Sequence, residues 1–500
     1  MNVGLWLSRH AKTHGARSAL FHGNELVADY AGFHNGASKV ASLLKKRMVK
    51  PGDRVGIYMN NHPDYLLALH GCWYAGAVVV PINAKLHAKE VSWILADSGA
   101  SMCFSRNSCE SSLRKTEVTC PIINLDLAHE TCDMEPEYRS SDDLAWLFYT
   151  SGTTGRPKGV KITHGMLASV SLSYLADVDF ATPADATLYC APISHGAGLY
   201  CLVHVLAGAR HVVPQSGGFT PREILDLAES FNDAHFFAAP TMVRRLTEYA
   251  KANDLPGMGI RTIVYGGGPM YVADIVEAVD HFGAKFIQIY GQGEAPMAIT
   301  ALSRADVADR SHAEWRERLA SVGRAQSIAE VQIGDREGRP LTQGEVGEIM
   351  VRGDLVMPGY WNNDEGTSSA FCNGWLMTGD MGCLNEDGYL TLKDRSKDLI
   401  VSGGANVYPR EVEEVLLSHP AVAQASVIGK PSTEWGEDVV AFIVPDREVD
   451  EKTLDEFCLD NIARFKRPKS YCMVKELPTN NYGKVIKAEL RKMLEEKVND

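Results

Sequence analysis

The segment Tyr149–Val160 constrains this chain most, because it places three glycines, four aliphatic hydroxyl residues and one lysine between two apolar flanks. Glycines allow the backbone to direct consecutive N–H groups at an anion, and the hydroxyls and Lys158 add donors and positive charge at the same place. The preceding apolar segment Leu144–Phe148 predicts a strand, so we expect the loop to leave the edge of a sheet. The sequence therefore predicts a phosphate-binding loop.

Two other interpretations of this loop are weaker. Spacing excludes a Walker A loop, because Pro157 stands where that pattern needs its second glycine and Gly159 follows Lys158 in place of serine or threonine. A surface connector is the usual identity of a stretch rich in glycine, serine and threonine. A connector, however, does not need hydroxyls, glycines and a lysine in a fixed order.

Length and composition limit the possible functions. A chain of 500 residues that is 45% hydrophobic and 23% charged is expected to form two or more domains with large cores. The net charge of −13 argues against a nucleic-acid binder, and it requires local cations such as Lys158 to meet any anionic substrate. The 11 cysteines contain no CxxC pair, so we expect neither disulfides nor a zinc site, and a reducing cytoplasm fits best. Neither a signal peptide at Met1–Gly15 nor a transmembrane segment is expected.

Strand and helix patterns alternate through most of the chain, which predicts an α/β fold with parallel or mixed sheets covered by helices. A helix is expected at Pro63–Tyr74, and a strand at Ala77–Val80 that Pro81 ends. Near Gly323 the pattern changes to short strands with glycine-rich turns, which predicts a small β-rich subdomain. After the charged cluster Lys393–Asp398 a compact mixed module follows, so we expect a domain boundary there.

Six further segments have compositions that suit chemistry. The Tyr290–Glu294 segment offers an aromatic ring for stacking on a purine and a carboxylate for Mg²⁺, and Tyr265–Met270 contains three glycines that leave a flat surface for a planar group. On local grounds alone each of five segments has a simpler alternative. These are a strand-to-helix turn at Gly266–Gly268, a structural histidine at His195, a common turn at Thr378–Asp380, a solvated charge run at Asp394–Asp398 and an exposed lysine at Lys484. The other four segments are Ala191–Gly198, Gly374–Asp380, Asp394–Pro409 and Pro478–Lys487.

Taken together and in this order, the phosphate loop and these segments resemble the motifs of the adenylate-forming superfamily, which includes acyl-CoA synthetases, peptide-synthetase adenylation domains and luciferases. The chain is most like a standalone acyl-CoA synthetase, since it ends soon after Lys484 with no carrier module. The resemblance implies a large N-terminal domain of stacked α/β sheets, residues 1–394, with a β-rich subdomain at about 323–394. It also implies a hinge at residues 395–398 and a small mobile α+β domain at residues 399–500.

The resemblance also implies roles for individual residues. The implied catalytic residues are Lys484, Glu294 and Thr154, with Glu294 also binding the metal. The hinge would be Lys397, and the coenzyme A channel would be formed by Gly403, Gly404 and Ala405. The acyl pocket would be lined by His195, Ala239, Gly266 and Gly291. The implied ATP-binding residues are Thr150, Ser151, Gly152, Thr153, Thr154, Gly155, Lys158, Gly267, Gly268, Tyr290, Gly291, Asp380, Arg395 and Lys484.

The implied reaction is that of an acid–CoA ligase using ATP, Mg²⁺ and coenzyme A. A carboxylate attacks the α-phosphate of ATP to give an acyl-adenylate and pyrophosphate, and the thiol of coenzyme A then displaces AMP. Alternatives are an adenylating enzyme that loads a separate carrier protein and a nucleotide-dependent acyl sensor with little turnover. The partners expected are a small carboxylic acid, ATP and CoA, with no nucleic acid; the oligomeric state stays open, a homodimer being one option.

Two features of the sequence concern the choice of carboxylic acid and the hydrogen bonding of the ATP phosphates. The apolar Phe236–Pro240 segment and the glycines around it favour an apolar aromatic, medium-chain or long-chain acid, and His195 is interpreted as pocket lining rather than as a general base. Gly293 departs from the family, which usually has threonine or serine there. If only the hydroxyl is missing, Gly293→Thr should preserve or raise adenylation.

Overall fold

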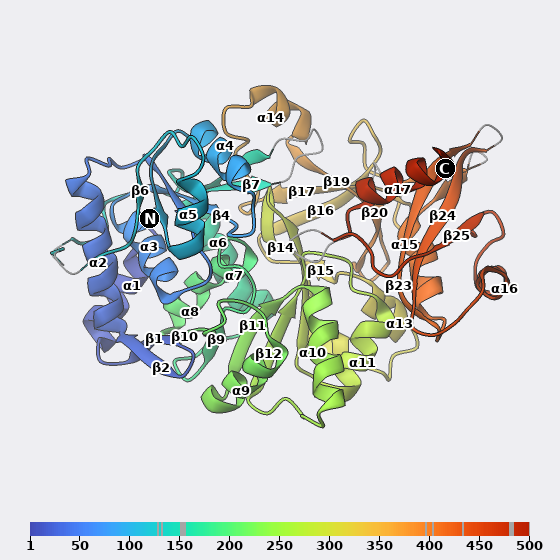
Figure 1. Cartoon of the computed structure of the whole chain (residues 1–500), viewed down its shortest axis with the longest axis horizontal. Helices are drawn as coiled ribbons and strands as arrows, with labels where there is room; N and C mark the ends of the chain where they lie inside the picture. The colour runs from blue at the N-terminus through green and yellow to red at the C-terminus, as the bar shows by residue number, and fades with distance from the viewer. Residues whose placement is uncertain are drawn as a thin grey trace.

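The computed structural model describes residues 1–499 except 128–129, 132–133, 151–156, 396–397, 403–404, 433–434 and 480–484, and it describes only the backbone of residues 107–108 and 495–499. Figure 1 shows the N-terminal helices and strands at one end of an elongated molecule and the C-terminal strands at the other. The described residues form four sheets.

The first sheet has six strands in the order β6-β5-β3-β4-β7-β8. Its strands β3 to β6 are parallel, whereas β7 and β8 form an antiparallel hairpin at one edge. Helices α3, Pro63–Tyr74, and α4, Ala88–Ser98, connect the central strands; α4 begins with a capping box of His87 and Glu90. The strands are β3 Arg54–Tyr58, β4 Val78–Ile82, β5 Ala100–Ser105, β6 Ile122–Ile123, β7 Leu144–Thr150 and β8 Lys158–Thr163, and the last helix is α5 Asn107–Leu113.

The prediction of a helix at Pro63–Tyr74 is confirmed, and the prediction that Pro81 ends a strand is wrong. Pro81 lies inside β4, opposite Ile57 of β3. The ladder between β4 and β7 is confined to Val79 and Trp146. A proline is tolerated where one side of a strand has no ladder partner, so β4 continues to Ile82.

The second sheet has nine strands in the order β15-β14-β13-β12-β11-β9-β10-β1-β2. The neighbouring strands β13, β12, β11, β9, β10 and β1 are parallel. At the two edges, β2, β14 and β15 pair in antiparallel fashion. The strands are β1 Ser18–His22, β2 Glu25–Asp29, β9 Ala186–Leu188, β10 Arg210–Val213, β11 Ala234–Ala238, β12 Ile260–Tyr265, β13 Phe286–Gln292, β14 Ala295–Leu302 and β15 Arg324–Ala325. Carboxyl ends of neighbouring parallel strands meet at one edge, which is where ligands bind in such sheets.

Helices on both sides of the two sheets bury their apolar faces against the strands (Figure 1). A side-chain acceptor caps α2, where the Asp29 carboxylate accepts from the Gly32 amide, and α6, where the Thr163 hydroxyl accepts from the Met166 amide. The helices are α1 Leu5–His14, α2 Tyr30–Lys46, α6 His164–Ser173, η1 Tyr174–Val178, α7 Gly196–Leu199, α8 Cys201–Ala207, α9 Pro221–Phe231, α10 Pro240–Ala252, α11 Val272–Phe282, α12 Arg304–Ala308 and α13 Trp315–Ala320.

Two smaller sheets complete the fold, each with five strands. One follows residue 328 and contains β16 Ala329–Gly334, β17 Gly347–Gly353, β18 Phe371–Cys372, β19 Trp375–Leu384 and β20 Leu390–Arg395, with helix α14 Asp364–Ala370. The other contains β21 Ile400–Ser402, β22 Ala405–Val407, β23 Val422–Ser432, β24 Gly436–Pro445 and β25 Ser470–Met473, with helices α15 Pro409–Leu417, α16 Glu451–Asn461 and α17 Lys487–Asn499. The predicted fold class, stacked α/β sheets with a β-rich part and a small α+β C-terminal part, is confirmed.

Candidate active site

The β7–β8 hairpin positions the phosphate loop. Thr150 ends β7 directly opposite Lys158, which begins β8, so the seven residues between them connect two paired strands. β8 is the edge strand of its sheet, as expected from the sequence. Five residues predicted to bind ATP, Ser151, Gly152, Thr153, Thr154 and Gly155, lie outside the described residues.

Lys158 and Glu294 are linked by a tyrosine that the sequence analysis did not identify. The Tyr360 hydroxyl donates to Glu294 Oε1 at 2.7 Å, and Lys158 Nζ lies 4.9 Å from the centroid of the Tyr360 ring. Burial, together with the Glu294 carboxylate, raises the pKa of Tyr360, so this hydroxyl remains a donor at neutral pH. Tyr360 thus fixes the carboxylate that was assigned to the metal and attracts the lysine assigned to ATP.

Tyr360 reaches this place because its segment pairs with the edge of β8. The Trp361 amide donates to the Gly159 carbonyl at 2.7 Å, and the Lys161 amide donates to the Gly359 carbonyl at 3.1 Å. The Met357 amide also donates to the carbonyl of Glu294 at 2.9 Å. Only a proline and a glycine before two aromatic residues marked this segment in the sequence, which is too common a signal to predict the contact.

Tyr290, Asp380 and Arg395 converge from three strands. The Tyr290 hydroxyl donates to Asp380 Oδ2 at 2.7 Å, and Arg395 Nε lies 2.9 Å from Asp380 Oδ1. Tyr290 is 7% exposed and Asp380 8%, and burial together with the Asp380 charge raises the pKa of Tyr290. The two partners hold this carboxylate in one orientation.

The interpretation of Gly374–Asp380 as a turn needs correction. Gly374 lies in the turn before β19, but Asp380 lies within β19, paired with Arg395 of β20. Leu376, Thr378 and Asp380 point to the buried side of this strand, although two of them are polar, so hydrophobic alternation does not predict this arrangement. Gly379, with φ +71°, supplies the irregularity that glycine in a strand usually marks.

The predicted glycines of the pocket divide into two that pack against backbone and two beside open space. A Cβ at Gly266 would lie 2.6 Å from the Ile289 carbonyl oxygen, and one at Gly291 would lie 2.4 Å from the Met297 amide nitrogen, so both positions require glycine. Gly267 adopts φ +80°, where side chains are strained. At Gly268 the nearest atom to an added Cβ is 3.8 Å away. A planar group can therefore approach the backbone here.

His195 and Ala239 follow the carboxyl ends of β9 and β11. Ala239 is the N-cap of α10 and is half-buried. The His195 ring lies 4.9 Å from the Phe148 ring, edge to face, and its Nδ1 lies 3.0 Å from Ser194 Oγ. Desolvation lowers the pKa of His195 to about 3. A neutral imidazole in apolar surroundings suits a pocket wall better than a base acting at neutral pH.

Gly293 packs against the hairpin, which changes the expectation for its substitution. A Cβ at this position would lie 2.4 Å from Thr150 Cγ2 and 3.1 Å from Phe148 Cδ1. The space for a side chain is therefore occupied by the methyl group of Thr150. The expectation that Gly293→Thr preserves or raises adenylation was based only on the missing hydroxyl. The contact with Thr150 predicts instead that this substitution lowers the rate of adenylation.

The C-terminal residues of the predicted site are only partly described. Lys397, Gly403, Gly404 and Lys484 lie outside the described residues. Ala405 begins β22 and is half-buried. The segment near the predicted hinge contacts the C-terminal helix, since Lys487 Nζ at the start of α17 lies 3.5 Å from both Asp394 Oδ2 and Glu413 Oε1.

Comparison with known proteins identifies the family. Residues 7–361 match the family model described as AMP-binding enzyme, and residues 411–484 match the model of the AMP-binding enzyme C-terminal domain. The chain belongs to the AMP-binding enzyme family. This confirms the resemblance inferred from the motifs.

Similar proteins cover nearly the whole of this AMP-binding enzyme. It is 35% identical over 499 residues to a feruloyl-CoA synthase of an Amycolatopsis species, covering 98% of each chain. It is 35% identical over 491 residues to the 2-succinylbenzoate–CoA ligase of Bacillus velezensis, covering 98% of this chain and 97% of that protein. The structure of the o-succinylbenzoate CoA synthetase of Bacillus subtilis with its acyl-adenylate intermediate superposes with a TM-score of 0.86 at 32% identity, covering 98% and 97% of the two chains.

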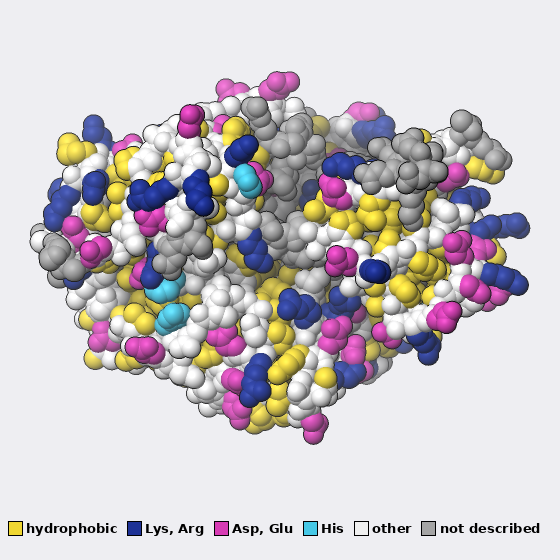
Figure 2. All heavy atoms as spheres, in the orientation of Figure 1, with side chains coloured by type: hydrophobic (Ala, Val, Ile, Leu, Met, Phe, Trp, Pro, Cys, Tyr) yellow, Lys and Arg dark blue, Asp and Glu magenta, His cyan; other side chains and the backbone are white. Residues whose placement is uncertain are grey.

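The enzyme is thus an AMP-forming acid–CoA ligase, a class that uses ATP and CoA. Among the described residues, no helix is both long and apolar enough to cross a bilayer. Figure 2 shows basic and acidic side chains interspersed on the face in view.

Proposed function

We propose that this AMP-binding enzyme activates an apolar carboxylic acid, with an aromatic acid as the first choice, and transfers its acyl group to coenzyme A. Two similar proteins are named for aromatic acids, feruloyl-CoA synthase and 2-succinylbenzoate–CoA ligase. Gly267 and Gly268 support a planar acyl group, since no atom lies nearer than 3.8 Å to a Cβ built at either position.

The observation that carries the proposal is the position of the turn at Gly293–Glu294, between β13 and β14. Tyr290 before this turn holds Asp380, Gly293 within it packs on Thr150 of the phosphate hairpin, and Glu294 at its end is held by Tyr360. One turn therefore joins the groups that we assign to the ribose, the phosphates and the metal. This arrangement suits a reaction in which positioning and charge stabilisation supply most of the acceleration.

Each group has a defined task in the proposed first step. Asp380 accepts hydrogen bonds from the ribose hydroxyls, and Arg395 contacts the nucleotide. The Ser151–Gly155 amides and hydroxyls, with Lys158, hold the β- and γ-phosphates that leave as pyrophosphate. A carboxylate oxygen of the acid attacks the α-phosphorus, and the bond between the α-phosphorus and the pyrophosphate oxygen breaks. Lys484 neutralises the negative charge shared by the carboxylate and the α-phosphate.

The donor set at Glu294 fits Mg²⁺. One carboxylate oxygen accepts from Tyr360 at 2.7 Å, and a carboxylate has further lone pairs for a cation. Mg²⁺ is usually bound by one or two carboxylates together with substrate phosphates rather than by a full protein cage. Accordingly, no cluster of three or more acidic, histidine or cysteine ligands is found in the described part of the chain. When bound, Mg²⁺ would neutralise phosphate charge.

In the proposed second step the thiol of coenzyme A attacks the acyl carbonyl and AMP leaves with the bonding electrons. Residues 399–500 would turn about Lys397 between the steps, which withdraws Lys484 and brings Gly403, Gly404 and Ala405 to the thiol channel. The division of the core is compatible with such a movement, because two hydrophobic clusters consist only of residues from Ile400 onward.

Pyrophosphate release tests the proposal. The enzyme is mixed with MgATP and aromatic, medium-chain and long-chain acids, with and without CoA. Acid-dependent pyrophosphate release that is fastest with an aromatic acid, and AMP and thioester in equal amounts once CoA is added, are expected. ATP binding without pyrophosphate release for any acid would contradict the proposal and favour a sensor.

A further inference from the structure

A small cavity with unpartnered polar side chains lies behind the wall of the proposed acyl pocket. Its volume is about 10 Å³, the room of about one oxygen atom. It is lined by residues of η1, β9, α7, α8, β11 and β12, namely Tyr174, Thr187, Leu188, Tyr189, Ala197, Tyr200, His204, His235, Phe236, Phe237 and Val264.

The cavity continues the surface that lines the acyl pocket. Side chains two residues apart share a face of a strand, so His235 and Phe237 of the cavity lie on one face of β11, and Ala239 of the pocket follows this strand directly. Phe237 joins the two spaces, because its ring lies 3.5 Å from a Cβ built at Gly196 and 3.8 Å from one built at Gly267. The four residue steps of extended chain from His235 to Ala239 span about 13 Å, the length of about one ring with a short chain.

Three buried side chains at this inner end have polar atoms without a partner among the described residues. These atoms are Tyr200 Oη, His204 Nε2 and His235 Nδ1. Tyr200 is 5% exposed, His204 2% and His235 1%. A buried polar group without a hydrogen bond is costly, and a purely apolar pocket end would contain none.

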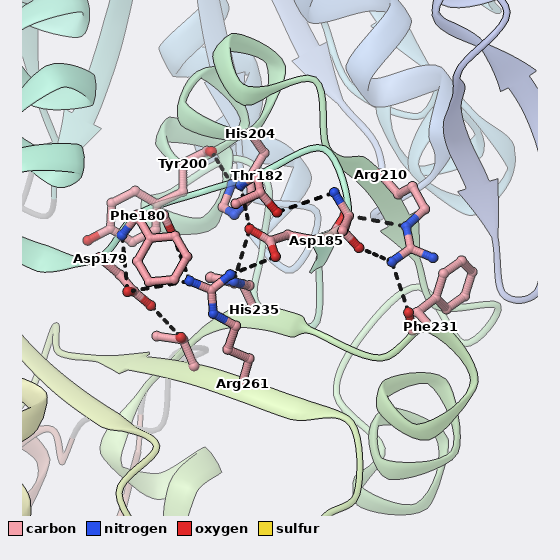
Figure 3. Close-up of polar contacts among 12 residues, drawn as sticks. Asp179, Phe180, Thr182, Asp185, Tyr200, His204, Arg210, Phe231, His235 and Arg261 are labelled. Carbon is pink, nitrogen blue, oxygen red and sulfur yellow. Dashed lines mark hydrogen bonds and ion pairs between the residues drawn. The ribbon is translucent and has the colours of Figure 1, made fainter.

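The other contacts of these residues define what they can bind. His204 Nδ1 lies 2.9 Å from the Tyr200 carbonyl oxygen (Figure 3). A carbonyl only accepts, so Nδ1 carries the proton, and burial lowers the pKa of His204 to about 3, which keeps the ring neutral. Nε2 of His204 is therefore an acceptor, while the Tyr200 hydroxyl can donate.

The network behind the cavity keeps His235 in place. His235 Nε2 lies 3.5 Å from Asp185 Oδ2, and Asp185 Oδ1 lies 2.6 Å from Arg261 Nη1 (Figure 3). The Thr182 amide also donates to Asp185 Oδ2 at 2.6 Å. The polar inner end therefore belongs to a connected set of buried ionic groups rather than to a single misplaced side chain.

From this geometry we infer that the acid has a hydroxyl group at the end opposite its carboxylate, and that Tyr200 and His204 select it. The hydroxyl accepts from Tyr200 and donates to His204 Nε2, which satisfies both atoms with one oxygen. This inference rests on the proposed function and narrows its substrate class from apolar acids to hydroxyl-terminated ones.

Matched acids test the inference. We would compare 3-phenylpropenoic acid with its 4-hydroxyphenyl form, and octanoic acid with 8-hydroxyoctanoic acid, by kcat/KM for pyrophosphate release. The hydroxylated member of at least one pair is expected to be favoured by about 100-fold or more, because a site built for a hydroxyl rejects the analogue without it. Equal values within every pair would overturn the inference.

Variants separate selection from structure. Tyr200→Phe should reduce this preference by about 10-fold or more and leave kcat/KM for the non-hydroxylated acid within about 3-fold, and His204→Leu should act in the same direction. The matched control is Tyr189→Phe, which also lines the cavity but whose hydroxyl lies 2.7 Å from His211 Nδ1; it should keep the preference. An equal loss for both acids in Tyr200→Phe would show a structural role only.

A binding measurement keeps this result independent of turnover. The non-hydrolysable acyl-sulfamoyl adenosine analogues of the phenylpropenoic pair are titrated calorimetrically into wild-type enzyme and Tyr200→Phe. Tighter binding of the hydroxylated analogue by the wild type alone supports the inference even if no acid releases pyrophosphate, which would contradict only the proposed function. Equal dissociation constants for the two analogues in the wild type would contradict the inference.

Discussion

Replacing Gly293 by threonine tests whether this site is shaped around a missing hydroxyl or around a packed methyl group. An added Cβ would lie 2.4 Å from Thr150 Cγ2, whereas carbon atoms pack at about 3.5 Å or more. The hairpin or the Gly293–Glu294 turn must therefore move by about 1 Å. A displacement of this size near reacting groups costs up to about 100-fold, and overpacking costs about 1–3 kcal/mol.

We therefore expect Gly293→Thr to lower the rate of acid-dependent ATP–pyrophosphate exchange by about 10- to 100-fold. Gly293→Ala should lose nearly as much, because the contact involves the Cβ and not the hydroxyl. The double variant Gly293→Thr/Thr150→Ser removes the methyl group and keeps the hydroxyl at residue 150, so it should recover to within a few-fold of Thr150→Ser alone. Thermal unfolding measured in parallel reports any loss of folded protein.

Two results would refute this reasoning. Exchange by Gly293→Thr at or above the wild-type rate would mean that Thr150 gives way freely and that the missing hydroxyl limits the enzyme. A loss that Thr150→Ser does not relieve would mean that the damage does not come from the contact between residues 150 and 293. In either case the proposed packing between the turn and the phosphate hairpin would not control adenylation.

Three further predictions concern the metal, the mobile lysine and acid stability. Tyr360→Phe keeps the ring beside Lys158 but removes the hydrogen bond to Glu294, so the Mg²⁺ concentration for half-maximal exchange should rise about 10-fold; an unchanged Mg²⁺ dependence would contradict this role. Lys484→Ala should abolish adenylation but leave conversion of added acyl-adenylate to thioester largely intact, and equal loss in both half-reactions would exclude a role confined to the first. Burial lowers the folded-state pKa of His164 and of His204 to about 3. Between about pH 6.5 and pH 3 the unfolded chain therefore binds more protons than the folded chain, and the free energy of unfolding decreases as the pH is lowered. Each histidine should cost about 1.4 kcal/mol per pH unit in that window, and equal urea midpoints at pH 7.5 and 5.5 would be inconsistent with two buried neutral rings.

Motifs within short segments of the sequence identified several residues that the structure brings together. Tyr290, Asp380 and Arg395 were each assigned to the nucleotide from the sequence, and the structure brings them into direct contact. Strand and helix patterns likewise predicted the α/β class and the helix at Pro63–Tyr74. The predictions of the fold class and of the helix were confirmed because they depend on periodicity and on residue types close together in the chain. The assignment of Tyr290, Asp380 and Arg395 to the nucleotide stays a prediction.

Contacts between distant segments were not predictable in the same way. Tyr360 meets Glu294 only because residues 357–361 pair with the edge of β8, and the pairing of an edge has no local signature. Gly293 illustrates the same limit. The sequence motif suggests that a hydroxyl is missing at this position, whereas the structure shows that Thr150 at the end of β7 occupies the space for a side chain. The inner cavity depends on α7, α8 and β11 together, so His204 and His235 had no pattern that linked them.

Transfer of oxygen from the acid to AMP tests the central claim most directly. The enzyme is incubated with MgATP, CoA and an accepted acid labelled with ¹⁸O in its carboxylate, and the nucleotide and phosphate products are examined by mass spectrometry. The account predicts one ¹⁸O in the phosphate of each AMP formed, because the acid oxygen attacks the α-phosphorus and stays with AMP when the thiol displaces it. Unlabelled AMP, or label in inorganic phosphate together with ADP, would contradict an acyl-adenylate intermediate.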